Sequence, residues 1–164
     1  MRYQNNQLYF ECQLISLWNA SRYYNIEIPK IGSKEYNRIC DESRCIYGGC
    51  IDIEKEKQRL GLRSMRGKYN LIWVRNNLPV HFSIFCHRDY HSVLGIKIYK
   101  TKILLANYAY NRTHWISWKN LRERIIMNKC LICGYNGQLL FSSFEFSNKS
   151  CNNFVSPNDK FHDS

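Results

Sequence analysis

The chain has few acidic residues, little proline and no long apolar run. It carries 13 Asp and Glu against 24 Lys and Arg, which gives a net charge of +11, and only 3 of its 164 residues are proline. No stretch approaches the roughly 20 apolar residues that span a bilayer, and the N-terminal segment MRYQNNQLYFECQL lacks the apolar core of a secretion signal. We therefore expect no membrane span and a cytoplasmic protein, or one associated with a virion.

The scarcity of acidic residues points to an acidic partner. A strongly positive chain favours association with nucleic acid or with another anionic surface. The basic residues are scattered, however, and form no run longer than two. The scattered pattern therefore favours a solvated positive surface over a dedicated binding surface.

The apolar content excludes a disordered chain. Hydrophobic residues make up 45% of the sequence and aromatic residues 15%, which is well above the composition that keeps chains unfolded. The length suits one domain with a core of its own. We expect a single domain over residues 1–147 and a polar C-terminal tail over residues 148–164.

The eight cysteines have three plausible roles in a chain without a secretion signal: free thiols, metal ligands or a nucleophile. Cys130-x-x-Cys133 has the spacing of half a zinc knuckle, and Cys40, Cys45 and Cys50 are candidates for the remaining ligands. The partner cysteines are not spaced by two residues, which favours free thiols. We expect no bound metal and no cofactor.

Periodicity and turn signals indicate an α+β fold. Helical patterns start at or next to Cys12, after Ser33 and after Asp52, with Gly61 as a stop, and a short helix is expected near 69–76. Short segments rich in Val, Ile, Leu and Tyr follow at 80–85, 91–99 and 102–108, and they predict three consecutive antiparallel strands. A short helix is expected from Ser117, and Asn136-Gly137 is a strong hairpin signal. Helices therefore precede an antiparallel sheet.

Cys12 is the leading candidate for a reactive residue. A cysteine in the first turn of a helix lies at the positive end of the helix dipole, which favours the thiolate and predicts a lowered thiol pKa. The N–H groups of that turn can donate to an oxyanion. Gln7 or Asn6 would supply a second donor from the preceding loop, and the spacing does not choose between them.

His91 and Asn107 are candidates for the partners of this thiol. His91 begins the strand HSVLGIKIY, where an imidazole can face a thiol from the opposite layer. Asn107 ends the next strand, and its side-chain amide is placed to accept the imidazole N–H and fix the tautomer. Two rival bases fit less well, because His81 lies inside its strand and His114 follows the Asn instead of preceding it.

This order of residues resembles papain-like cysteine peptidases, and most closely the subgroup that removes double-glycine leaders. The segments that carry the resemblance are QRLGL, LPVHFSIF, YHSVLGI, KILLANY and HWISWKNL, within residues 4–125. The sequence departs from the family pattern in having Gln13 after the cysteine, where the family has Gly, and Asn107 where the subgroup prefers Asp. The resemblance implies a papain-like fold with N-terminal helices packed on a C-terminal antiparallel sheet.

The resulting hypothesis is a thiol hydrolase that cleaves a peptide or isopeptide bond of a polypeptide substrate. Its catalytic residues would be Cys12, His91 and Asn107, with Gln7 in the oxyanion hole. The alternative is a catalytically inactive papain-fold protein whose basic surface binds nucleic acid, or which is a structural component of a phage or viral particle.

Overall fold

The computed structural model describes residues 3–6, 11–43, 53–66, 70–86, 89–109, 111–125 and 141–146. The helices are α1 (Cys12–Tyr23), α2 (Lys34–Ser43), α3 (Glu54–Leu60), α4 (Leu71–Asn76) and α5 (Trp118–Arg124). The strands are β1 (Leu62–Arg66), β2 (Val80–Cys86), β3 (Asp89–Tyr99), β4 (Lys102–Ala109), β5 (Arg112–Ser117) and β6 (Phe141–Phe146). This part of the chain is an α+β structure, as expected.

The six strands form one sheet in the order β1-β6-β2-β3-β4-β5, and every neighbouring pair is antiparallel. Strands β2 to β5 follow the chain order, as consecutive hairpins do. The last described strand, β6, returns between β1 and β2. The three strands expected from the sequence are β2, β3 and β4, and they pair as predicted.

Local sequence signals account for several helix ends. Ser33 accepts the Tyr36 N–H at 3.1 Å and so caps α2. Gly61 ends α3 in the left-handed conformation, with a φ of 70°, which glycine adopts without a steric penalty. Asn70 accepts the Trp73 N–H at the start of α4. Strand β5 was not predicted from the sequence.

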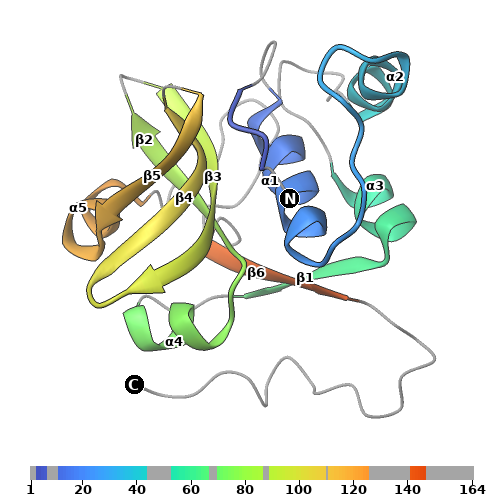
Figure 1. The fold of residues 1–164 in the computed structure, drawn as a ribbon. Coiled ribbons are helices and arrows are strands. Elements are labelled where there is room, and N and C mark those ends of the chain that lie inside the picture. The colour runs from blue at the N-terminus through green and yellow to red at the C-terminus, as the bar shows by residue number, and fades with distance from the viewer. Residues whose placement is uncertain are drawn as a thin grey trace, which may run out of the picture.

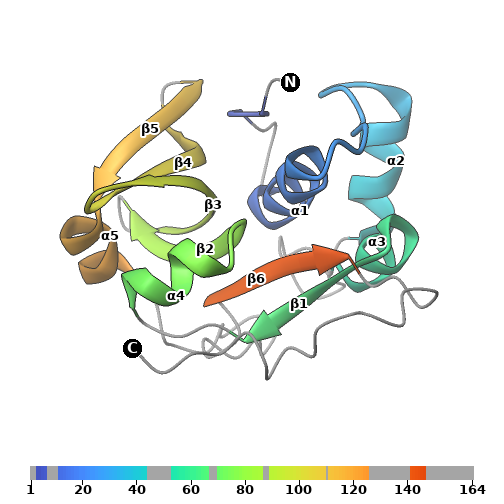
Figure 2. The same ribbon diagram turned by 60° about the horizontal axis from the view of Figure 1, so that its bottom comes forward.

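Helix α1 is the central element of the fold. Figures 1 and 2 show it between the strands β2 to β5 on one side and helices α2 and α3 on the other. Every residue from Leu14 to Ser21 is buried, polar ones included. A helix that is covered all round takes its position from the core and not from an amphipathic stripe. Its first residue, Cys12, is therefore held at a fixed place relative to the sheet.

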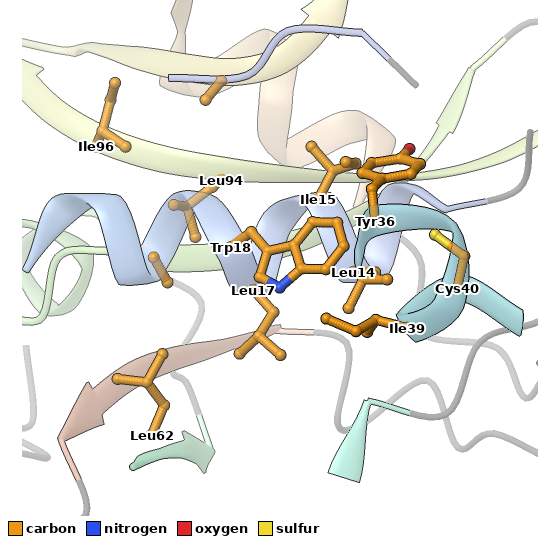
Figure 3. Packing of buried hydrophobic residues seen from close by; sticks show 12 residues of the cluster. Leu14, Ile15, Leu17, Trp18, Tyr36, Ile39, Cys40, Leu62, Leu94 and Ile96 are labelled. Carbon is orange, nitrogen blue, oxygen red and sulfur yellow. The ribbon is translucent and has the colours of Figure 1, made fainter. Parts of the chain in front are cut away.

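Two clusters of buried residues lie on the two faces of the sheet. The first joins α1 and α2 to β3 and β4 and includes Leu14, Trp18, Ile39, Leu94 and Ala106 (Figure 3). The second joins α4 and α5 to the opposite face and includes Trp73, Phe82, Val93, Ile103 and Leu121. Alternate residues of β3 and β4 thus serve different clusters, as the two-residue repeat of a strand requires.

Several sequence expectations lie outside the described residues. These are the Asn136-Gly137 hairpin, the tail at 148–164, Asp52, and the cysteines Cys45, Cys50, Cys130 and Cys133. Among the residues that the structure does describe, no three or more His, Cys, Asp or Glu side chains are grouped to hold a metal ion. No helix within those ranges is long and apolar enough to cross a membrane.

Gly95 of β3 provides a test of the packing of the second cluster. A Cβ at this position would lie 2.6 Å from Cδ1 of Ile103 and 2.9 Å from Cε2 of Phe82. We predict that Gly95→Ala lowers the free energy of unfolding by about 1–3 kcal/mol through overpacking. Urea unfolding measures this loss.

Ile103→Val removes the closest clashing atom and serves as the matched control. It should cost stability in the wild-type background and restore part of the stability in the Gly95→Ala background, since neighbouring sites couple. Strictly additive effects of the two substitutions would show that the clash does not govern packing here.

Candidate active site

The site is assembled from the start of α1, the start of β3, the end of β4 and the N-terminal segment at 3–6. Cys12 is the first residue of α1, and its side chain is half-buried. The thiol is hydrogen-bonded to both the main chain and the hydroxyl of Ser92, the residue that follows His91 in β3. The thiol therefore contacts the residue that directly follows His91 in β3.

The resting thiol is not activated in the way the sequence suggested. Burial raises the pKa of Cys12 above its ordinary value of 9.0. Hydrogen bonds from Ser92, and from the main-chain N–H groups of Gln13 and Cys12, act in the opposite direction. The expected effect of the helix start is present, but the loss of solvation outweighs it. The expectation of a lowered pKa was wrong, and the free protein holds Cys12 as a neutral thiol at neutral pH.

His91 is tied to Asn107. Its Nε2 lies 2.5 Å from the main-chain carbonyl oxygen of Asn107. A carbonyl oxygen only accepts, so Nε2 carries the proton, and in the neutral imidazole the lone pair is then on Nδ1. This hydrogen bond leaves Nδ1 as the basic nitrogen of the ring.

Asn107 contacts His91 through a different group from the one expected. The contact shown with His91 comes from its main chain, whereas the sequence argument invoked its side-chain amide. Asn107 has a φ of 61°, in the left-handed region, which Asn tolerates better than most residues. The β4–β5 register shifts between Leu105 and Ala109. A strand irregularity thus turns the carbonyl toward the imidazole.

The N-terminal segment closes the site from the other side. Asn5 Oδ1 accepts the Asn107 N–H at 2.8 Å. Asn19, buried in α1, accepts the Gln4 N–H at 2.8 Å and donates to the Gln4 carbonyl at 2.9 Å. The segment is therefore bonded to both α1 and β4. Sequence reasoning missed Asn5, Asn19 and Ser92, although the position of Ser92 directly after the candidate base was a usable signal.

Gln7 and Asn6 both remain candidates for the second donor to the oxyanion. Gln7 lies outside the described residues. Asn6 is exposed, and its carbonyl accepts a hydrogen bond from the Gln4 side chain. The Cys12 and Gln13 N–H groups already lie at the sulfur, where an oxyanion formed by attack would also lie.

The rival bases occupy different environments. His81 is only 3% exposed, and burial lowers its pKa to about 4, with smaller contributions in the same direction from Lys57 and His91. So weak a base is poorly matched to proton transfer near neutral pH. His114 lies on β5, and its ring packs edge-on against Tyr108 at 5.7 Å. Neither histidine has the place beside the Cys12–Ser92 contact that His91 has.

Consecutive side chains of a strand leave it on opposite faces. The Ser92 hydroxyl and the His91 ring therefore diverge from β3, and the Ser92 main chain, which also bonds the thiol, lies between them. The geometry shown consists of two adjoining pairs, Cys12 with Ser92 and His91 with Asn107. Direct proton transfer between the thiol and the imidazole belongs to the functional proposal below.

Comparison with known proteins adds no assignment to this geometry. No model of a known protein family matches the sequence, and no curated protein matches it either.

The raised pKa predicts how Cys12 reacts with iodoacetamide. Modification in the free protein should be slow at pH 6 and should accelerate with pH, with an apparent pKa above 9.0. Ser92→Ala removes a hydroxyl that lowers the pKa of Cys12. In this variant the apparent pKa of Cys12 should therefore be higher than in the wild-type protein, and Cys12 should be modified more slowly at any given pH. Mass spectrometry of the labelled peptide measures both rates.

Ser83→Ala is the matched control, because Ser83 is buried directly opposite Ser92 in the β2–β3 ladder. It should leave the pH profile of Cys12 unchanged. Rapid modification at pH 6, or an equal shift in the two serine variants, would contradict the described environment of the thiol.

Proposed function

We propose that the chain is a papain-like cysteine peptidase that hydrolyses a peptide or isopeptide bond through a thioester on Cys12. The observation that carries the proposal is the continuity of contacts from the first turn of α1 to Ser92, and from the adjoining His91 to the Asn107 carbonyl. A thiol at a helix start, a base on a facing strand and a group that orients the base are the parts this chemistry needs.

The raised thiol pKa supports general-base activation over a preformed ion pair. Nδ1 of His91 takes the Cys12 proton as the sulfur attacks the carbonyl carbon of the substrate, while Nε2–H stays bonded to Asn107. The tetrahedral oxyanion accepts hydrogen bonds from the N–H groups of the first turn of α1. His91 then gives its proton to the leaving amine, and the thioester forms.

Water completes the cycle. His91 takes a proton from the water molecule as the water oxygen attacks the thioester carbon. The C–S bond breaks, the product leaves as a carboxylic acid, and the sulfur regains a proton from His91. Asn107 is a positioning residue, because its carbonyl fixes the orientation of the His91 ring.

Arrangement of the elements also supports a papain-like fold. The nucleophile helix is buried against an antiparallel sheet, and the candidate base and its orienting residue lie on adjacent strands of that sheet, β3 and β4. Half-buried Gln13 follows Cys12 where the family has Gly. A side chain at that place narrows the approach to the sulfur and favours an extended or small-residue substrate at the cleavage point.

The test is hydrolysis of a mixed peptide library, read by mass spectrometry, in three proteins. Wild-type protein should cleave a subset of the peptides. Cys12→Ala should cleave them at least about a thousandfold more slowly, because no covalent route remains. Cys40→Ala is the matched control, since Cys40 is a cysteine of α2 that is buried in the core, away from the candidate site. It should retain most of the activity in folded protein.

Full hydrolysis by folded Cys12→Ala would remove this site from consideration. No hydrolysis by the wild-type protein, and no labelling of Cys12 by peptide-based electrophiles, would favour the alternative of an inactive papain-like fold.

A further inference from the structure

We propose that the exposed face of strands β3, β4 and β5 binds single-stranded nucleic acid, separately from the candidate active site. The binding surface, called the aromatic platform below, consists of Lys97, Tyr99, Lys102, Leu104 and Trp115. The bases would stack on Tyr99 and Trp115, and the lysines would contact the phosphates.

Strand register places these side chains on one face. Tyr99 is directly opposite Lys102, and both Lys97 and Trp115 are opposite Leu104 on their respective sides. Lys102 and Leu104 are two residues apart in β4 and so point the same way. Ile98, Ile103 and Ile116 occupy the alternate positions and pack into the second cluster. The five platform residues are therefore neighbours on a continuous three-stranded surface.

Helix α1 leaves this part of the face open. It packs mainly on β3 and to a smaller extent on β4, as Figure 1 shows. Leu104 borders the first cluster, and beyond it Tyr99 is 62% exposed and Trp115 is 45% exposed. Lys97 and Lys102 are exposed beside them. Two large aromatic rings held in water on one face of a sheet are typical of a binding surface.

The local charge identifies the class of partner. The sequence from Tyr90 to Arg122 contains no Asp or Glu. Its basic residues are Lys97, Lys100, Lys102, Arg112, Lys119 and Arg122. Lys97, Lys100 and Lys102 thus lie on or directly beside the platform, whereas Lys119 and Arg122 belong to α5, which packs on the opposite face of the sheet. This distribution complements a polyanion.

The aromatic rings favour a single strand over a duplex. Base stacking on Tyr or Trp needs an exposed base face, and in a duplex those faces are covered by neighbouring bases. Tyr99 and Trp115 are two strands apart, which is about 10 Å across the sheet. Successive bases of a duplex rise by only about 3.4 Å. An extended single strand that crosses the platform would fit this spacing.

Fluorescence anisotropy with a labelled oligothymidylate of about 15 nucleotides tests the proposal directly. The wild-type protein should bind it more tightly than a duplex of equal length. Tyr99→Ala and Trp115→Ala should each weaken binding by about tenfold or more, the usual loss for one stacked base. Trp115→Phe keeps a stacking ring and should retain most of the affinity. A double variant with Gln at positions 97 and 102 should show a slope of the logarithm of the binding constant against the logarithm of salt concentration that is smaller in magnitude by about 1.4.

Tyr23→Ala is the matched control, because Tyr23 is an exposed aromatic residue at the far end of α1. It should bind as the wild-type protein does, and far-UV circular dichroism shows that each variant is folded. Binding that the aromatic substitutions do not affect, or equal binding to duplex, heparin and anionic vesicles, would overturn the proposal in favour of non-specific attraction to polyanions. The absence of binding by wild-type protein would also overturn it.

Discussion

Burial of α1 from Leu14 to Ser21 is the constraint on which the other features depend. Leu14, Leu17 and Trp18 have no exposed surface, so the helix cannot shift without opening the first cluster. Two polar contacts fix its position further. The Trp18 indole donates to buried Glu56 at 2.9 Å, and Asn19 holds the main chain of Gln4 on both sides. These bonds tie α3 and the N-terminal segment to the same helix, and they place Cys12 against β3.

The same burial sets the chemistry of the thiol. A nucleophile placed at a buried helix start gains N–H donors but loses water, and here the loss of water has the larger effect on its pKa. Such a thiol resists stray alkylation and oxidation, since the thiolate is the reactive form. In the proposed mechanism, activation then depends on a base that takes the proton during attack. His91 suits this role because its hydrogen bond to the Asn107 carbonyl leaves Nδ1 as the basic nitrogen.

The aromatic platform and the candidate site use different parts of the same strands. The first cluster covers the α1 side of the sheet around Leu94 and Ala106. Past a register irregularity between Gly95 and Lys97, that face is no longer covered and carries Tyr99 and Lys102. One sheet can therefore hold a cysteine site at one end of β3 and a polyanion surface at the other, without either using the residues of the other.

Much of the fold was predictable because its signals are local. Ser33 and Gly61 marked helix ends through capping chemistry, and the apolar runs of β2, β3 and β4 marked strands. Strand β5 was missed because RTHWIS contributes half-buried and exposed residues without a clear apolar alternation. The direction of the Cys12 pKa and the main-chain role of Asn107 depend on burial and on a positive φ, which arise only once α1, β3 and β4 are packed together.

The central proposal is that Nδ1 of His91 takes the Cys12 proton while the Asn107 carbonyl holds Nε2–H. Nitrogen NMR of the histidine rings in ¹⁵N-labelled protein at neutral pH tests it most directly. The account predicts that His91 is the tautomer protonated at Nε2, and that converting Cys12 to a methyl disulfide shifts its Nδ1 resonance while the ring of His114 is unaffected. A His91 ring protonated at Nδ1, or an Nδ1 resonance that does not respond to modification of Cys12, would contradict it.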